Sequence, residues 1–148
     1  MTWLGAIHVL LMAAALAIGT GLLGAAKGTP RHRAWGRGFA AAVLVSNILV
    51  FAIHEDSATL GVFHLLAVVS FASVLAAVVL VRRRKGGLGP RIGHGHVMLW
   101  SFGGMVAAGL GQGATLLGQP PWPAIFATFL VVGLLAAKLD FKAMLTGR

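Results

Sequence analysis

The chain has 148 residues, of which 58% are hydrophobic and only 10% are charged. This composition is far more apolar than that of a soluble domain and excludes a water-soluble globule. A formal net charge of +9 would suggest nucleic-acid binding in a soluble protein, whereas in a membrane protein it reports how the loops are oriented. We therefore expect an integral membrane protein that contacts the lipid bilayer and no nucleic acid.

Five hydrophobic stretches follow one another along the chain, and each approaches the roughly 20 residues that a membrane-spanning helix needs. They cover residues 4–26, 36–53, 60–81, 97–117 and 123–140. None of them alternates polar with apolar residues as the strand of a membrane barrel does. The sequence therefore predicts an all-α integral membrane protein, with residues 1–148 forming a single transmembrane domain. Its five transmembrane helices are expected to form a four-helix bundle plus one peripheral helix.

Basic residues are confined to alternate connections of this arrangement. All 12 Lys and Arg residues lie in or at the edge of three regions, namely the first connection, the third connection and the C-terminal segment. With five crossings these regions fall on one face, which the positive-inside rule makes cytoplasmic. We expect a location in the inner (cytoplasmic) membrane of a bacterium, with the N-terminus outside and the C-terminus in the cytoplasm.

Histidine is the plentiful metal ligand, because the chain has six histidines and no cysteine. A strongly polar side chain within a bilayer is costly and indicates a functional site by default. Four histidines pair by expected depth: His8 with His64 near the outer face, and His32 with His96 near the inner face. The 19 residues from His8 to Lys27 span about 28 Å of helix, so that one site cannot use both depths.

Two imidazoles from facing helices, with no competing carboxylate or thiolate, suit the axial ligation of an iron porphyrin. The spacing therefore predicts one or two b-type haems. Basic side chains flank the inner histidines, where they are expected to pair with haem propionates; these are Arg31, Arg33 and Arg91.

Other polar and small residues have two interpretations each. His54, beside two acids, and His94, close to the inner face, are less favoured as metal ligands than as solvated residues. Asn47 is expected to bond a neighbouring helix or to contact a cofactor edge or a proton path. The small residues Gly103, Ala107 and Gly111 offer space for a porphyrin, yet their spacing is also typical of close helix packing.

The segment KGTPRHRAWGR at residues 27–37, with His8, the FH at 63–64 and the RRR that ends the third stretch, resembles a bacterial membrane-protein family of unknown function. Its most specific element is a Lys-Gly-Thr-x-x-His-Arg-x-x-Gly core. The ligand layout is similar to that of four-helix dihaem b-type cytochromes, which include ascorbate-dependent transmembrane reductases and a bacterial superoxide oxidase. This second likeness implies one haem near each membrane face and does not imply a substrate.

The leading expectation is transmembrane electron transfer through bis-histidine b-type haem, in a membrane oxidoreductase of the cytochrome b kind. Partners consistent with it are a quinone, another redox protein and, in a homo-oligomer, a second copy of the chain. One alternative is a membrane permease or accessory subunit that is cofactor-free or binds copper or zinc. Another is an enzyme with a single metal at His8, His54 and His64. No catalytic residue is identified.

Overall fold

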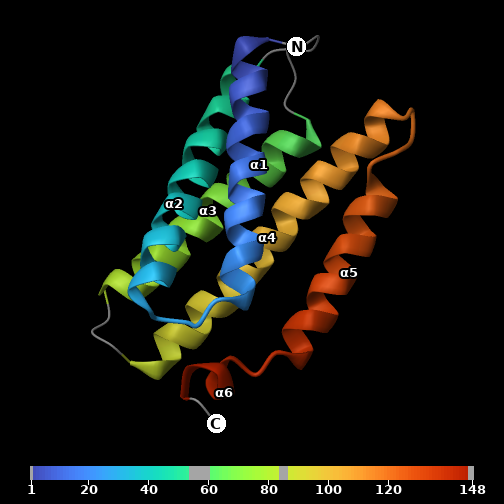
Figure 1. The fold of residues 1–148 in the computed structure, drawn as a ribbon. Helices are drawn as coiled ribbons and strands as arrows, with labels where there is room; N and C mark the ends of the chain where they lie inside the picture. The colour runs from blue at the N-terminus through green and yellow to red at the C-terminus, as the bar shows by residue number, and fades with distance from the viewer. Residues whose placement is uncertain (1, 54–60, 84–86, 147–148) are drawn as a thin grey trace. The chain divides into compact units, whose positions relative to one another are not determined.

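A computed structural model describes residues 2–53, 61–83 and 87–146, and every regular element in these ranges is helical. The prediction of an all-α chain is confirmed for these residues. The elements, drawn in Figure 1, are α1 (Trp3–Gly24), α2 (Pro30–Leu49), the short 3-10 helix η1 (Val50–Ala52), α3 (Val62–Arg83), α4 (Leu88–Leu116), α5 (Trp122–Lys138) and α6 (Phe141–Thr146).

The chain divides into two compact units, residues 1–78 and 79–148. The first unit contains α1, α2, η1 and most of α3, and it buries Phe39, Val43 and Val74. In it, α1 and α2 lie side by side as a helical hairpin (Figure 1). The second unit contains α4, α5 and α6, with a core in which Leu99, Val132 and Phe141 pack together.

Three helices of the described chain are long and apolar enough to cross a membrane: Trp3–Gly24, Pro30–Ala52 and Phe63–Arg82. Helix α5 is apolar but shorter, with 17 residues. Large apolar side chains stay exposed on the long helices; Leu10, for example, is 70% exposed and Leu65 64%. Because lipid, and not water, suits such a surface, the fold is that of a helical membrane protein.

Two helices begin more than one turn before their hydrophobic stretches. Helix α2 begins at Pro30, where the sequence predicts residue 36, and α4 begins at Leu88, where it predicts residue 97. A hydrophobic stretch marks the apolar part of a helix, whereas the backbone ladder continues through polar residues until a cap ends it. Thr29 is that cap in α2, and Pro30 occupies the first helical position, which lacks a bonded N–H in any helix.

The turn between α1 and α2 is built from the KGTPRHR segment. Gly28 adopts a φ of 77°, which reverses the chain. The side chain of Thr29 accepts a hydrogen bond from the His32 amide at 3.1 Å. Arg33 donates from Nη1 to the Gly28 carbonyl oxygen at 2.7 Å. The turn therefore holds the basic segment against the end of α1.

Lys27 closes the other side of this turn. Its Nζ donates to the carbonyl oxygens of Leu22 at 2.6 Å and Leu23 at 2.9 Å in the last turn of α1. The Leu22 carbonyl oxygen also accepts from the Ala25 amide at 3.4 Å. Burial lowers the pKa of the Lys27 ammonium below the ordinary value of 10.5. The cation of Lys27 thus serves the fold and not a ligand.

Candidate functional site

The side chain of His8 on α1 faces Ser46 on α2. The His8 Nδ1 lies 2.8 Å from the Ser46 hydroxyl oxygen and 3.3 Å from the Ser46 carbonyl oxygen. The Ser46 hydroxyl is also 3.4 Å from the carbonyl oxygen of His8. His8 is half-buried and Ser46 is fully buried, so these contacts tie the two helices together inside the first unit.

The two contacts of the His8 ring depend on its tautomer. Because a carbonyl oxygen accepts, the 3.3 Å contact is a hydrogen bond in the tautomer that carries the proton on Nδ1. The Ser46 hydroxyl then accepts from the same N–H and donates to the His8 carbonyl. In the neutral ring this leaves the lone pair on Nε2, as in metal-bound histidines, which typically donate their other ring N–H to a carbonyl or carboxylate.

A second polar contact adjoins the first. Asn47 is only 5% exposed, and its Nδ2 donates to the Ser70 hydroxyl on α3 at 3.0 Å. His8, Ser46, Asn47 and Ser70 therefore form a polar layer that runs across α1, α2 and α3 within the first unit. Of the two interpretations of Asn47, the structure shows the hydrogen bond to a neighbouring helix.

His64, the expected partner of His8, contacts a backbone amide donor through its Nδ1. Its Nδ1 accepts a hydrogen bond from the Gly61 amide at 3.2 Å, so the neutral ring carries its proton on Nε2. His64 is the third residue of α3 and acts on its N-terminus as the Glu of a capping box does. Its ring also packs on Phe51, with centroids 5.6 Å apart. Ligation of a metal or haem by His8 and His64 stays a prediction.

The inner histidines fall in different units, His32 in the first and His96 in the second. His32 is half-buried in the first turn of α2. The ring of His96 packs edge-on against Phe141 of α6, with centroids 4.6 Å apart. His94 is half-buried in α4, and His54 lies outside the described residues. Pairing of His32 with His96 stays a prediction.

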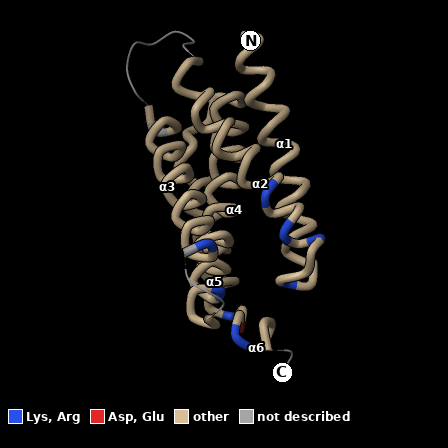
Figure 2. Tube along the Cα trace, turned by 90° about the vertical axis from the view of Figure 1, so that its left-hand side faces the viewer, with Lys and Arg blue, Asp and Glu red and all other residues tan. Residues whose placement is uncertain are grey.

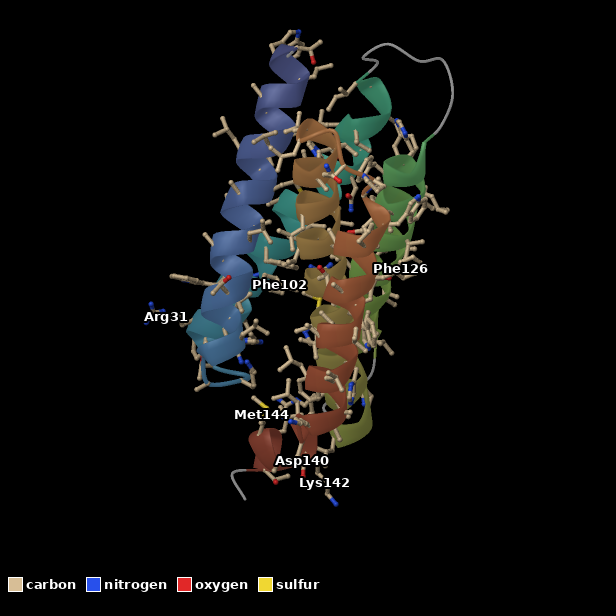
Figure 3. All side chains as sticks on the ribbon, turned by 90° about the vertical axis from the view of Figure 1, so that its right-hand side faces the viewer. Arg31, Phe102, Phe126, Asp140, Lys142 and Met144 are labelled. Atoms are coloured by element: carbon tan, nitrogen blue, oxygen red, sulfur yellow. The ribbon has the colours of Figure 1, made fainter. Side chains whose placement is uncertain are left out.

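The three arginines named as propionate partners differ in their contacts. Arg33 is bonded to Gly28 as described above. Arg31 lies over the ring of Trp35, with its guanidinium carbon 5.0 Å from the ring centroid. Figure 3 shows the Arg31 side chain extending away from the helices. Arg91 is exposed at the start of α4. Arg31 and Arg91 are therefore better placed than Arg33 to contact a ligand.

Helix packing occupies the small residues of α4. A Cβ added to Gly103 would lie 2.5 Å from Cγ2 of Val132, and one added to Gly111 would lie 3.1 Å from Cγ1 of Ile125. Ala107, between these two glycines, is fully buried. The side chains of α5 therefore fill the space beside both glycines, which is the close helix packing that the spacing predicts.

Sequence reasoning did not identify the partners of three residues that define these surroundings: Ser46, Ser70 and Trp35. Ser46 and Asn47 were visible as polar residues within a hydrophobic stretch, but no pattern indicated their partners. Among residues 2–53, 61–83 and 87–146, no three His, Asp or Glu side chains form a group that could hold a metal ion. A metal or haem held within the described residues would therefore have at most two of these side chains as ligands.

These features define a helical membrane protein with a polar layer inside its first unit. A model of the family described as "Predicted membrane protein (DUF2306)" matches residues 5–139. The chain belongs to this family, which confirms the resemblance to a membrane family of unknown function. Neither the curated proteins nor the solved structures contain a match to the chain.

Proposed function

We propose that the chain is an integral membrane electron carrier in which His8 supplies an axial imidazole to a b-type haem. The observation that supports this proposal is the contact of His8 Nδ1 with Ser46, at 2.8 Å to the hydroxyl and 3.3 Å to the carbonyl oxygen; with the proton on Nδ1, this contact leaves the Nε2 lone pair for iron. The same arrangement orients and polarises histidines in known metal sites. When bound, haem iron supplies reversible one-electron transfer, with a potential that the axial ligands and the local dielectric set.

The second axial ligand in this proposal is His64, which must first release the Gly61 amide and move its proton to Nδ1. A second haem near the inner face uses His32 and His96, with Arg31 and Arg91 near the propionates. A quinone or another redox protein is the proposed donor or acceptor. The oxidoreductase would then pass electrons from one membrane face to the other.

An absorption spectrum tests the proposal. Purified full-length protein should be coloured and show a reduced-minus-oxidised spectrum of haem b. His8→Ala and His64→Ala should each lose the outer haem, whereas the matched control His94→Ala should keep the spectrum. A preparation that stays colourless after haem is supplied during expression would overturn the proposal.

A second candidate is a membrane permease or accessory subunit that lacks haem and is cofactor-free or holds copper or zinc. Two observations favour it: α5 side chains occupy the space beside Gly103 and Gly111, and His64 serves as a helix cap. Elemental analysis separates the two candidates, since iron with a haem spectrum supports the first, and copper, zinc or no metal supports the second.

We also propose the five-crossing orientation, with α4 and α5 as the last two spans, the N-terminus outside and the C-terminus in the cytoplasm of a bacterium. The support is the distribution of Lys and Arg. Fusions of alkaline phosphatase should be active after residue 118 and inactive after residue 146. Equal activity at both positions would overturn the five-crossing arrangement.

A further inference from the structure

A groove lies in the helical hairpin at the end of the first unit where α1 meets α2. It has a volume of about 550 Å³. Its apolar wall comes from the end of α1 and its polar wall from the start of α2; the lining residues include Gly21, Leu22, Gly24, Arg31, His32 and Trp35. This volume falls within the range of about 300–1,000 Å³ of small-molecule sites and is more than a bare ion needs.

Glycines on α1 shape this groove. A Cβ added to Gly24 would meet no atom within 4 Å, so the space beside it is open. A Cβ added to Gly21 would lie 3.3 Å from the Trp35 ring, so Gly21 lets that ring approach the α1 backbone. The apolar wall belongs to a helix that is long and apolar enough to cross a membrane. An acyl chain suits such a wall.

The polar wall favours an anion. Residues 2–53 contain four Lys and Arg residues and no Asp or Glu, and Figure 2 shows the basic residues of this unit at the turn and along the start of α2. Lys27 and Arg33 donate to carbonyl oxygens of the turn itself. Arg31 is different, because its guanidinium carbon lies over the Trp35 ring, 5.0 Å from the ring centroid. A guanidinium on an aromatic face still offers N–H donors that suit a phosphate. The N-terminus of α2 adds its positive dipole end.

We propose that this groove binds an anionic phospholipid. The phosphate lies against Arg31 and the first turn of α2, and the upper part of an acyl chain lies along Gly21, Leu22 and Gly24. Trp35, which is 42% exposed, forms the floor at the level where tryptophans meet lipid headgroups. Basic pockets between spanning helices recognise anionic headgroups by the same chemistry. The proposal does not depend on haem.

Fluorescence quenching of Trp35 tests the site directly. The full chain carries Trp3→Phe, Trp100→Phe and Trp122→Phe, so that Trp35 is the remaining tryptophan. This variant is reconstituted in vesicles of phosphatidylcholine. Brominated phosphatidylglycerol should quench Trp35 with an apparent association constant about fivefold higher than that of brominated phosphatidylcholine, as one paired cation near the surface provides.

Two variants separate the groove from general charge attraction. Arg31→Ala should bring the preference for phosphatidylglycerol close to one, whereas Arg37→Ala, an equal loss of charge on the same helix outside the groove, should keep it. Gly24→Leu fills the open space and should reduce quenching by both lipids. Equal quenching in the parent protein, or an unchanged preference in Arg31→Ala, would overturn the proposal.

Two further measurements address the source of the anion and the effect of the tryptophan changes. Sodium phosphate, compared with sodium chloride of equal ionic strength, should leave the lipid preference intact; its abolition would identify a free-phosphate site and overturn the lipid assignment. Native mass spectrometry of the unaltered chain from an equimolar mixture should retain more phosphatidylglycerol than phosphatidylcholine. Retention of both lipids in equal amounts would contradict the site.

Discussion

The Nδ1 of His8 lies 3.3 Å from the carbonyl oxygen of Ser46, a residue 38 positions further along the chain and on a different helix. This contact is a hydrogen bond in the tautomer that carries the proton on Nδ1, because a carbonyl oxygen accepts. His64, by contrast, accepts a hydrogen bond from a backbone amide at its Nδ1. Two histidines that the sequence places at one depth therefore contact different groups through Nδ1, namely two oxygen atoms of Ser46 for His8 and the Gly61 amide for His64.

Ser46→Ala should loosen this arrangement without removing it, because the carbonyl of residue 46 remains. We expect the free energy of unfolding of the apoprotein to fall by about 0.6 kcal/mol, the average for a hydrogen bond between membrane helices. If haem binds at His8, its affinity should fall about 10- to 100-fold, as for other outer partners of a metal-bound histidine. Denaturant unfolding in detergent and haem titration measure the two effects.

Ser101→Ala is the matched control for Ser46→Ala. Ser101 is also buried, but its hydroxyl donates to the Val97 carbonyl within its own helix at 2.8 Å. This control should change neither haem affinity nor the packing between α1 and α2. Equal losses in both variants would show that Ser46 acts only as a buried hydroxyl.

Asn47→Leu should remove the contact between α2 and α3 in the first unit, since Nδ2 of Asn47 donates to Ser70 at 3.0 Å. A double-mutant cycle with Ser70→Ala should give a coupling energy of about 0.6 kcal/mol, with about 1.7 kcal/mol as the upper limit. The measurement is the free energy of unfolding of the four proteins. A coupling energy of zero would show that the pair contributes nothing to stability.

Gly103→Ala should destabilise the second unit, because the new Cβ would lie 2.5 Å from Val132 on α5. Overpacking of this kind costs about 1–3 kcal/mol. Gly104→Ala, one residue along the same helix, is the control, since a Cβ there meets nothing within 4 Å. The thermal unfolding temperature of Gly103→Ala should lie below that of the parent, and that of Gly104→Ala should equal it. Adding Val132→Ala to Gly103→Ala should restore part of the lost stability.

The pH dependence of stability should report Lys27. Burial holds the pKa of Lys27 in the folded chain below 10.5, its ordinary value. Between the lowered value and 10.5 the unfolded chain binds more protons than the folded one, so the free energy of unfolding should rise with pH over this window. Lys27→Met should lose this rise. Lys142→Met, at an exposed lysine of α6, is the control and should keep it.

The sequence was informative where local chemistry is sufficient. Gly28 reverses the chain, and Thr29 and Pro30 begin α2. The hydrophobic pattern placed this connection after the first stretch but put the start of the helix at residue 36, because it records apolar length and not caps. The glycine spacing of α4 predicted close packing, which Gly103 and Gly111 show against α5. The contacts of the site could not be predicted from the sequence, because the role of an imidazole depends on which group reaches each ring nitrogen. A partner 38 positions away leaves no periodic signal.

By itself, the sequence determined that this chain is a helical membrane protein, because hydrophobic length and the absence of alternation leave a helix as the form that satisfies its own backbone in lipid. It also placed a basic connection after the first hydrophobic stretch. Only the tertiary structure decided that His8 bonds to Ser46 and that Asn47 bonds to Ser70. These contacts arise from side chains on different turns and helices, and their geometry exists only once the helices have packed.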